Sequence, residues 1–271
     1  MNETHFSVIC DSSIDLPQET VDKYKINVVP YLISFDGKEY LRENADISVS
    51  ELYGRMKADK TIFPKTSMPS VMDYYDVMKK TAEMNTDILC MCMSGDLTSS
   101  VQSAENAAMM IREEYTGIQV RVMDTRMATA LQGIYVVEAA KLRDRGYTLS
   151  DAFDRLIQIQ GTGHIIFTMN TLDYLVHGGR IGKLKGLIAN VLSLKPLVSL
   201  VDGALNPLGV IRTRKQSLKR IADLYVKYIE DKKIDFDRFI FATGSGFDRK
   251  EGLAFHEMVK KALKEKFGYE E

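Results

Sequence analysis

The feature that most constrains the fold is the alternation of short apolar runs with longer helical patterns over the first 160 residues. Strands that alternate with helices form βαβ units, so we expect an α/β domain with a mostly parallel sheet flanked by helices. Ligands of such sheets bind at the carboxyl ends of the strands. The strand-like runs are 6–10, 27–35, 87–93 and 118–123, and the helical patterns are 17–24, 48–59, 71–83, 101–114, 128–145 and 149–160.

Small polar residues lie shortly before two of the helical patterns. Residues 94–100, Ser-Gly-Asp-Leu-Thr-Ser-Ser, connect the strand-like run 87–93 to the pattern 101–114, and Thr66 and Ser67 come shortly before the pattern 71–83. The first amides of a helix have no intrahelical partner, so hydroxyl-rich loops at helix starts can receive a small anionic head group. The alternative is that these Ser and Thr residues are ordinary helix caps.

The alternation of strand-like runs with helical patterns changes near Gly161, where we place a domain boundary between residues 1–160 and 161–271. The second part contains two strand-like runs joined by Asp202-Gly203, which predicts a hairpin. Antiparallel strands with helices packed on them indicate a smaller α+β domain. Further strands are expected at 164–168 and 236–242, helices at 172–177, 215–231 and 248–266, and a mostly apolar segment at 184–194.

Composition narrows the class of partner. The net charge of −1 arises from 36 basic and 37 acidic residues, so no global field favours nucleic acid. No segment approaches the length of a membrane span, and the first residues lack the pattern of a signal peptide, so we expect a cytoplasmic protein. Cys10, Cys90 and Cys92 fall in apolar runs, which predicts reduced, buried thiols and no metal site.

Residues 66–70, Thr-Ser-Met-Pro-Ser, and residues 11–17, Asp-Ser-Ser-Ile-Asp-Leu-Pro, resemble motifs of the DegV family of bacterial fatty-acid-binding proteins. The family's versions of these motifs are Thr-Ser-Gln-Pro-Ser and Asp-Ser-Thr-Ser-Asp-Leu-Pro. Residues 97–104 resemble Leu-Ser-Gly-Thr-Tyr-Gln-Ser-Ala, with Thr98, Ser99 and Val101 in place of Ser, Gly and Tyr. The most specific match is 172–181, which follows Leu-x-Tyr-Leu-x-x-Gly-Gly-Arg-Ile. The resemblance covers nearly the whole chain.

The resemblance implies a carrier with no catalytic residues, no cofactor and no metal. A long-chain fatty acid would lie in a buried apolar tunnel, mainly in the second domain, and a partner fatty acid kinase related to dihydroxyacetone kinases would phosphorylate its carboxylate with ATP. A transient contact with a membrane surface is allowed, and no nucleic acid is expected. The implied carboxylate ligands are Thr66, Ser67, Thr98 and Ser99, and the implied residues of the pocket mouth or partner docking surface are Arg180 and Arg212. Both arginines could instead be solvated surface charges.

A stand-alone serine hydrolase acting on acyl esters is the alternative. The sequence has no Gly-x-Ser-x-Gly elbow, P-loop, His-Glu-x-x-His or dinucleotide fingerprint. Ser94, Asp11 and His177 supply the residue types of a triad, which is recognised by its geometry.

DegV chains usually continue past the last helix into a strand and a loop with His, Thr and glycines; this chain ends at Glu271, and none of its four histidines stands in that motif.

Overall fold

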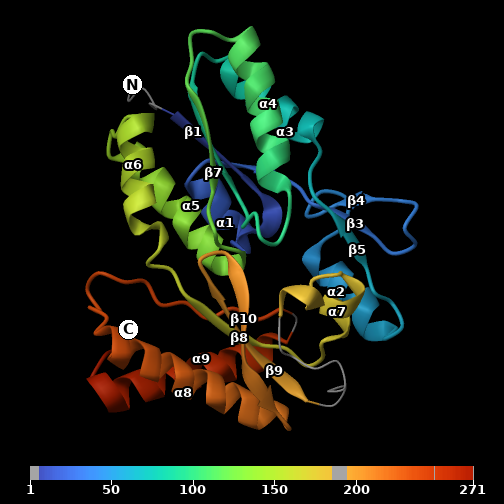
Figure 1. Cartoon of the computed structure of the whole chain (residues 1–271), viewed down its shortest axis with the longest axis vertical. Helices are drawn as coiled ribbons and strands as arrows, with labels where there is room; N and C mark the ends of the chain where they lie inside the picture. The colour runs from blue at the N-terminus through green and yellow to red at the C-terminus, as the bar shows by residue number, and fades with distance from the viewer. Residues whose placement is uncertain (1–5, 185–193, 247, 271) are drawn as a thin grey trace. The chain divides into compact units, whose positions relative to one another are not determined.

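The computed structural model describes residues 6–184, 194–246 and 248–270. The chain divides into two compact units, which are described separately below (Figure 1). Unit 1 consists of Met1–His164 with Val201–Ala204, and unit 2 of Ile165–Leu200 with Leu205–Glu271. The assignment of a head-group role to residues 1–160 and an acyl-chain role to residues 161–271 remains a prediction. Most of the apolar segment 184–194 lies outside the described residues.

Unit 1 is built on a four-stranded parallel sheet with the strand order β2-β1-β6-β7. Its strands are β1 (Phe6–Asp11), β2 (Ile26–Val29), β6 (Asp87–Cys92) and β7 (Val120–Asp124). The central strands β1 and β6 are almost entirely buried, as expected for a parallel sheet covered on both faces. The predicted α/β class is therefore confirmed.

The helices of unit 1 cover the two faces of this sheet (Figure 1). The helices are α1 (Gln18–Lys23), α3 (Val71–Ala82), α4 (Ser100–Glu114), α5 (Thr129–Asp144) and α6 (Leu149–Gln160), with a 3-10 turn η1 at Ser12–Ile14. Because successive side chains of a strand point to opposite faces, Val8 and Cys10 pack in the cluster with α5 and α6, whereas Ile9 packs in the cluster with α3 and α4.

The predicted single strand at 27–35 is wrong, because it divides into β2 and β3 (Leu32–Ser34). Pro30 separates them; it has no backbone N–H to continue a ladder. After Pro30 the chain leaves the parallel sheet and joins a small antiparallel sheet with the order β4-β3-β5. The other elements of this region are β4 (Leu41–Arg42), β5 (Lys65–Ser67) and α2 (Val49–Ala58).

The three cysteines are buried and free of disulfides, as predicted. Cys90 and Cys92 lie on one face of β6 with their sulfur atoms 3.9 Å apart. Both side chains belong to the cluster formed with α3 and α4. The thiols therefore contribute to core packing.

Unit 2 contains a three-stranded sheet with the order β10-β9-β8. Strands β9 (Lys195–Val201) and β10 (Ala204–Ile211) form the predicted hairpin, and β8 (Ile165–Thr168) pairs antiparallel with β9. Asp202 and Gly203 both have positive φ, 48° and 84°, as a two-residue turn of type I′ requires. The tip of this hairpin, Val201–Ala204, groups with unit 1.

The helices of unit 2 are α7 (Asp173–His177), α8 (Arg214–Lys232) and α9 (Arg249–Phe267), with a 3-10 turn η2 at Ile181–Lys183. The predicted strand at 236–242 is wrong, since these residues form no strand. Instead, Phe236 and Phe241 pack with Tyr269, with ring centroids 4.6 and 5.6 Å from that of Tyr269. Their apolar side chains thus join the small core of α8 and α9 rather than a sheet.

Candidate functional site

Polar loops of unit 1 meet at the carboxyl ends of the parallel strands. Asp11, the last residue of β1, accepts a hydrogen bond from the backbone N–H of Met93, with its Oδ2 atom 2.8 Å from that nitrogen. The Ser12 hydroxyl accepts one from the N–H of Tyr31 at 2.9 Å, and the Thr125 hydroxyl donates to the carbonyl of Cys92 at 2.8 Å. The loops after all four strands are therefore connected at this edge of the sheet.

Three hydroxyl groups, which we call the hydroxyl cluster, lie together where α4 begins. The Tyr31 hydroxyl oxygen lies 2.6 Å from Ser100 Oγ and 3.3 Å from Thr98 Oγ1, and the last two atoms are 3.3 Å apart. Ser100 is fully buried, whereas Tyr31 and Thr98 are partly exposed. The sequence predicted a role for Thr98 but missed Tyr31, because nothing in its local pattern distinguishes it from a core aromatic residue.

Two other predicted carboxylate ligands, Thr66 and Ser67, precede α3 in the sequence. Thr66 and Ser67 are on β5, where Thr66 pairs with Ile33 and Ser67 with Leu32, so their expected position at a helix start is wrong. The N-cap residue of α3 is Ser70. Its side chain accepts a hydrogen bond from the N–H of Asp73, and the Asp73 side chain accepts one from the N–H of Ser70. Ordinary capping therefore explains Ser70.

Capping does not explain Ser99. This residue occupies the N-cap position of α4, yet its side chain forms no capping hydrogen bond, and it is exposed. The neighbouring Thr98 hydroxyl is engaged with Tyr31 and Ser100 rather than with a helix amide. The hydroxyls at the start of α4 are thus not consumed in capping, which leaves this end of the helix suited to an anion.

Acidic side chains surround this edge of the sheet. Burial raises the pKa of Asp11 above its ordinary value, and hydrogen bonds from Ser13, Met93 and Gln132 oppose that shift. Burial likewise raises the pKa of Glu43, which accepts a short hydrogen bond from the Ser12 hydroxyl. The site therefore offers hydroxyl and amide donors in a partly buried, acidic setting.

The serine hydrolase alternative finds no support in the geometry of Ser94. This residue is 1% exposed, and its hydroxyl donates to the carbonyl of Gly203 at 2.8 Å. The carboxylate of Asp11 accepts from Ser13, Gln132 and Met93, and His177 belongs to unit 2. Ser94 thus helps to hold the hairpin tip, where a Cβ on Gly203 would lie 2.7 Å from the serine oxygen.

The predicted arginines lie in unit 2. Arg180 follows Gly179, whose φ of +73° takes the chain out of α7, and its guanidinium donates to the carbonyl of Gly178 at 2.6 Å. The Arg180 side chain is therefore held against the backbone. Arg212 is exposed between β10 and α8.

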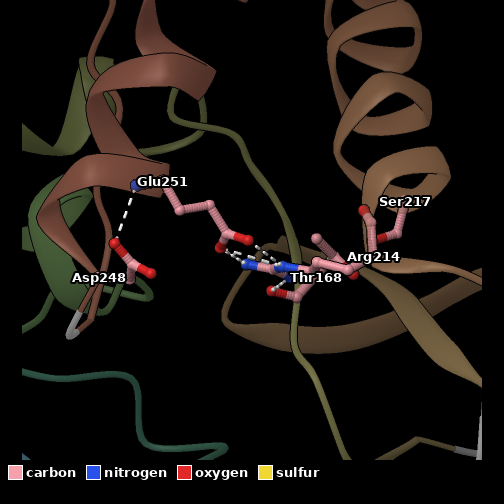
Figure 2. A network of polar contacts seen from close by, with 5 residues as sticks. All are labelled: Thr168, Arg214, Ser217, Asp248 and Glu251. Carbon is pink, nitrogen blue, oxygen red and sulfur yellow. Dashed lines mark hydrogen bonds and ion pairs between the residues drawn. The ribbon is translucent and has the colours of Figure 1, made fainter.

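Arg214, which sequence reasoning left without a role, forms the main polar network of unit 2 (Figure 2). Its guanidinium binds the Glu251 carboxylate, with the shortest N–O distance 2.6 Å, and also reaches the carbonyl of Thr168 at 3.4 Å. Because Glu251 also donates its N–H to the Asp248 cap, the network joins the starts of α8 and α9. The i to i+37 separation of Arg214 and Glu251 hides this pair from local pattern analysis.

A cavity of ≈ 370 Å³ lies in unit 2 between α8, α9 and the segment that follows residue 240. Tyr225, Phe241, Val259, Leu263 and Tyr269 supply apolar lining, and lysines of α9 lie at its polar part. None of the predicted site residues lines this cavity. The expected acyl tunnel therefore remains a prediction.

Membrane spans and metal clusters are both missing from the part of the chain that the structure describes. Within those residues, no helix combines the length and apolar character needed to cross a membrane. Over the same ranges, no group of three or more His, Cys, Asp or Glu side chains is arranged to hold a metal ion.

The fold defines a two-unit α/β protein whose parallel sheet carries a hydroxyl-lined edge. The family model described as "Uncharacterised protein, DegV family" matches residues 5–267. The chain belongs to the DegV family. A DegV domain-containing protein from Clostridium acetobutylicum is 32% identical over 219 residues, which are 80% of this chain and 75% of that relative.

Two solved structures of similar proteins have been described as fatty-acid-binding. A fatty acid (stearic acid)-binding protein from Eubacterium ventriosum is 32% identical, with a TM-score of 0.90 over 96% of this chain and 88% of that one. A DegV family protein from Thermus thermophilus, described by its fatty acid binding, is 30% identical, with a TM-score of 0.72 over 83% of this chain and 78% of that one.

Proposed function

We propose that this chain is a carrier that binds one long-chain fatty acid and has no catalytic residues of its own. The observation that carries the proposal is the hydroxyl cluster at the carboxyl edge of the sheet, in a fold shared with fatty-acid-binding relatives that are 32% and 30% identical. The carboxylate is held by Thr98 and Thr66, with Ser67 and Ser99 beside them.

The pairing of β5 with β3 supports the joint use of Thr66 and Thr98. Thr66 pairs with Ile33, two residues along the chain from Tyr31, and the Tyr31 hydroxyl contacts Thr98. Thr66 is therefore paired with β3 close to the point where the chain leaves Tyr31 and enters that strand. Hydroxyl groups bind an ionised carboxylate through charge-assisted hydrogen bonds.

The acyl chain supplies most of the affinity in this proposal. Burying about fifteen methylenes at ~0.8 kcal/mol each gives a gross driving force of ~12 kcal/mol. The loss of motional freedom on binding reduces that figure. The hydroxyls therefore set the orientation of the ligand, and an apolar tunnel formed mainly by residues 161–271 holds the chain.

The proposed carrier presents the carboxylate to a dihydroxyacetone-kinase-like fatty acid kinase. Arg180 and Arg212 are the residues assigned to the pocket mouth or to docking of that kinase, with a transient membrane contact during loading. The exposure of both side chains supports this role. Arginine is suited to it because its planar guanidinium binds phosphate and carboxylate groups in pairs of hydrogen bonds.

The test is calorimetric titration of delipidated protein with oleic acid and, separately, with oleyl alcohol. We expect saturable binding of the acid at one molecule per chain and weaker binding of the alcohol, which carries no charge for the hydroxyls to stabilise. Equal affinity for both ligands would contradict the proposed head-group site. Absence of binding by either would contradict the carrier function itself.

A further inference from the structure

We propose that Tyr31 is a head-group-binding residue, whose phenol donates a hydrogen bond to the carboxylate of the bound fatty acid together with Thr98, and that Ser100 positions this phenol. The inference rests on the proposed function, since it concerns the same ligand. It gives the carboxylate of the ligand a hydrogen-bond donor that no motif in the sequence indicates.

The distances within the hydroxyl cluster allow one carboxylate oxygen to meet both donors. The Tyr31 oxygen and Thr98 Oγ1 are 3.3 Å apart, so an oxygen placed about 2.7 Å from each forms two hydrogen bonds of normal charge-assisted length. Ser100 is fully buried and 2.6 Å from the phenol. Because Ser100 is closed to solvent, we assign it a contact with the phenol and not with the ligand.

The backbone of Tyr31 is fixed on both sides. Its N–H donates to the Ser12 hydroxyl at 2.9 Å, and its carbonyl accepts from the N–H of Glu43 at 2.9 Å. Ser12 in turn donates to the Glu43 carboxylate. With its backbone held by the segments that follow β1 and β4 and its hydroxyl held by Ser100, the phenol is ordered before a ligand arrives, which reduces the entropic cost of binding.

The electrostatic setting keeps Tyr31 a donor. Burial, followed by the negative charge of Asp11, raises the pKa of Tyr31 above its ordinary value of 10.0, so the phenol is protonated at neutral pH. A phenol is also a more acidic donor than the hydroxyl of Ser or Thr. Among the three hydroxyls, Tyr31 is thus the strongest donor to a carboxylate.

The experiment compares Tyr31→Phe with wild type in titrations of delipidated protein with oleic acid and with oleyl alcohol. We expect the variant to lose roughly 10- to 150-fold in affinity for the acid, as for a hydrogen bond to a charged group, with a much smaller change for the alcohol. Tyr135→Phe is the matched control, because its hydroxyl donates to the carbonyl of Leu156 at 2.6 Å in the core of the same unit. That control should leave both affinities unchanged.

Ser100→Ala tests the positioning role through a double-mutant cycle. The single variant should weaken oleic acid binding, and in the Tyr31→Phe background its effect should be much smaller, because Ser100 acts mainly through the phenol at 2.6 Å and only secondarily through Thr98 at 3.3 Å. Full independence of the two effects would overturn the positioning role. Unchanged oleic acid affinity in Tyr31→Phe would overturn the whole inference while leaving wild-type binding, and hence the carrier function, intact.

A spectroscopic measurement tests the contact without relying on mutant affinity. In protein labelled with 3-fluorotyrosine, the fluorine resonance absent from Tyr31→Phe identifies Tyr31. We expect oleic acid to shift this resonance and oleyl alcohol to shift it less. An identical shift with both ligands, or none with oleic acid, would contradict a hydrogen bond to the carboxylate.

Discussion

The phenol oxygen of Tyr31 and the Oγ1 atom of Thr98 are 3.3 Å apart, although 67 residues separate them in the sequence. The contact joins the loop after β2 to the loop after β6 at the carboxyl edge of the parallel sheet. In an α/β fold this edge is where ligands bind. The hydroxyl cluster is therefore the feature on which the functional predictions depend.

The first prediction concerns the two threonines. Thr98→Val keeps the volume and removes the donor, so it should weaken fatty acid binding by about 1.5–3 kcal/mol, or roughly 10- to 150-fold. Thr66→Val should act in the same direction, and the double variant should be less than additive if both hydroxyls serve one carboxylate. Calorimetry with oleic acid provides the measurement. Unchanged binding in both valine variants would mean that other residues bind the carboxylate, with Arg180 or Arg212 as the next candidates.

The second prediction concerns the pH dependence of stability. Because the folded protein raises the pKa of Glu43 above its ordinary value of 4.5, chiefly by burial, the unfolded chain loses this proton at lower pH than the folded one. Ionisation therefore favours unfolding, and the stabilising effect of the bound proton is present at low pH and is lost as the pH rises through the folded-state pKa.

Glu43→Gln isolates this effect, since glutamine keeps an acceptor for the Ser12 hydroxyl but does not ionise. The free energy of unfolding of the wild type, measured with urea relative to that of Glu43→Gln, should decrease from acid to neutral pH. If the free energy of unfolding of the wild type, relative to that of Glu43→Gln, instead increased over this range, the folded protein would have to lower the pKa of Glu43.

The third prediction concerns a buried hydroxyl in unit 2. Thr168 Oγ1 is buried and has no hydrogen-bond partner within the described part of the chain. Thr168→Val removes this group at nearly constant volume, so it should raise the free energy of unfolding by roughly 1 kcal/mol. Urea unfolding is the measurement.

Thr125→Val is the matched comparison in unit 1. Thr125 is fully buried, and its hydroxyl donates to the carbonyl of Cys92 and accepts from the N–H of Met127. The same replacement there should lower the free energy of unfolding by roughly 1–3 kcal/mol. If both replacements destabilised equally, the Thr168 hydroxyl would have a partner that contributes to stability.

The fourth prediction separates the carrier from a serine hydrolase. An activated serine would react covalently with a fluorophosphonate and give a burst with p-nitrophenyl esters. We expect neither, because the Ser94 hydroxyl donates to the carbonyl of Gly203 instead of to a base. Stoichiometric, saturable labelling that Ser94→Ala abolishes would establish the hydrolase in place of the carrier.

Much of the fold could be predicted because local patterns determine it. Apolar runs between helical patterns located β1, β6 and β7, and the Asp202-Gly203 turn located the hairpin of β9 and β10. The failures have physical reasons. Pro30 divided one expected strand into two, and the aromatic residues at 236–242 packed on Tyr269 and the helices instead of forming a ladder.

The candidate site was less predictable because its contacts join distant segments. Thr98 could be singled out by its position before a helix. Tyr31 could not, because it lies where the chain leaves the parallel sheet after Pro30 to enter the antiparallel sheet, and only its contact with Thr98 brings it into the hydroxyl cluster. Thr66 was placed at a helix start by its distance from residue 71, whereas pairing with Ile33 puts it on β5. Local spacing does not determine which strand a residue pairs with.

The proposal that the chain carries a long-chain fatty acid is best tested by the mass spectrum of lipid extracted from the purified protein. A dry apolar tunnel long enough for an acyl chain is unfavourable to keep empty in water. We therefore expect one long-chain fatty acid to be recovered per chain. Stoichiometric recovery of a phosphate, a nucleotide or a metal ion, with no fatty acid, would contradict the proposal.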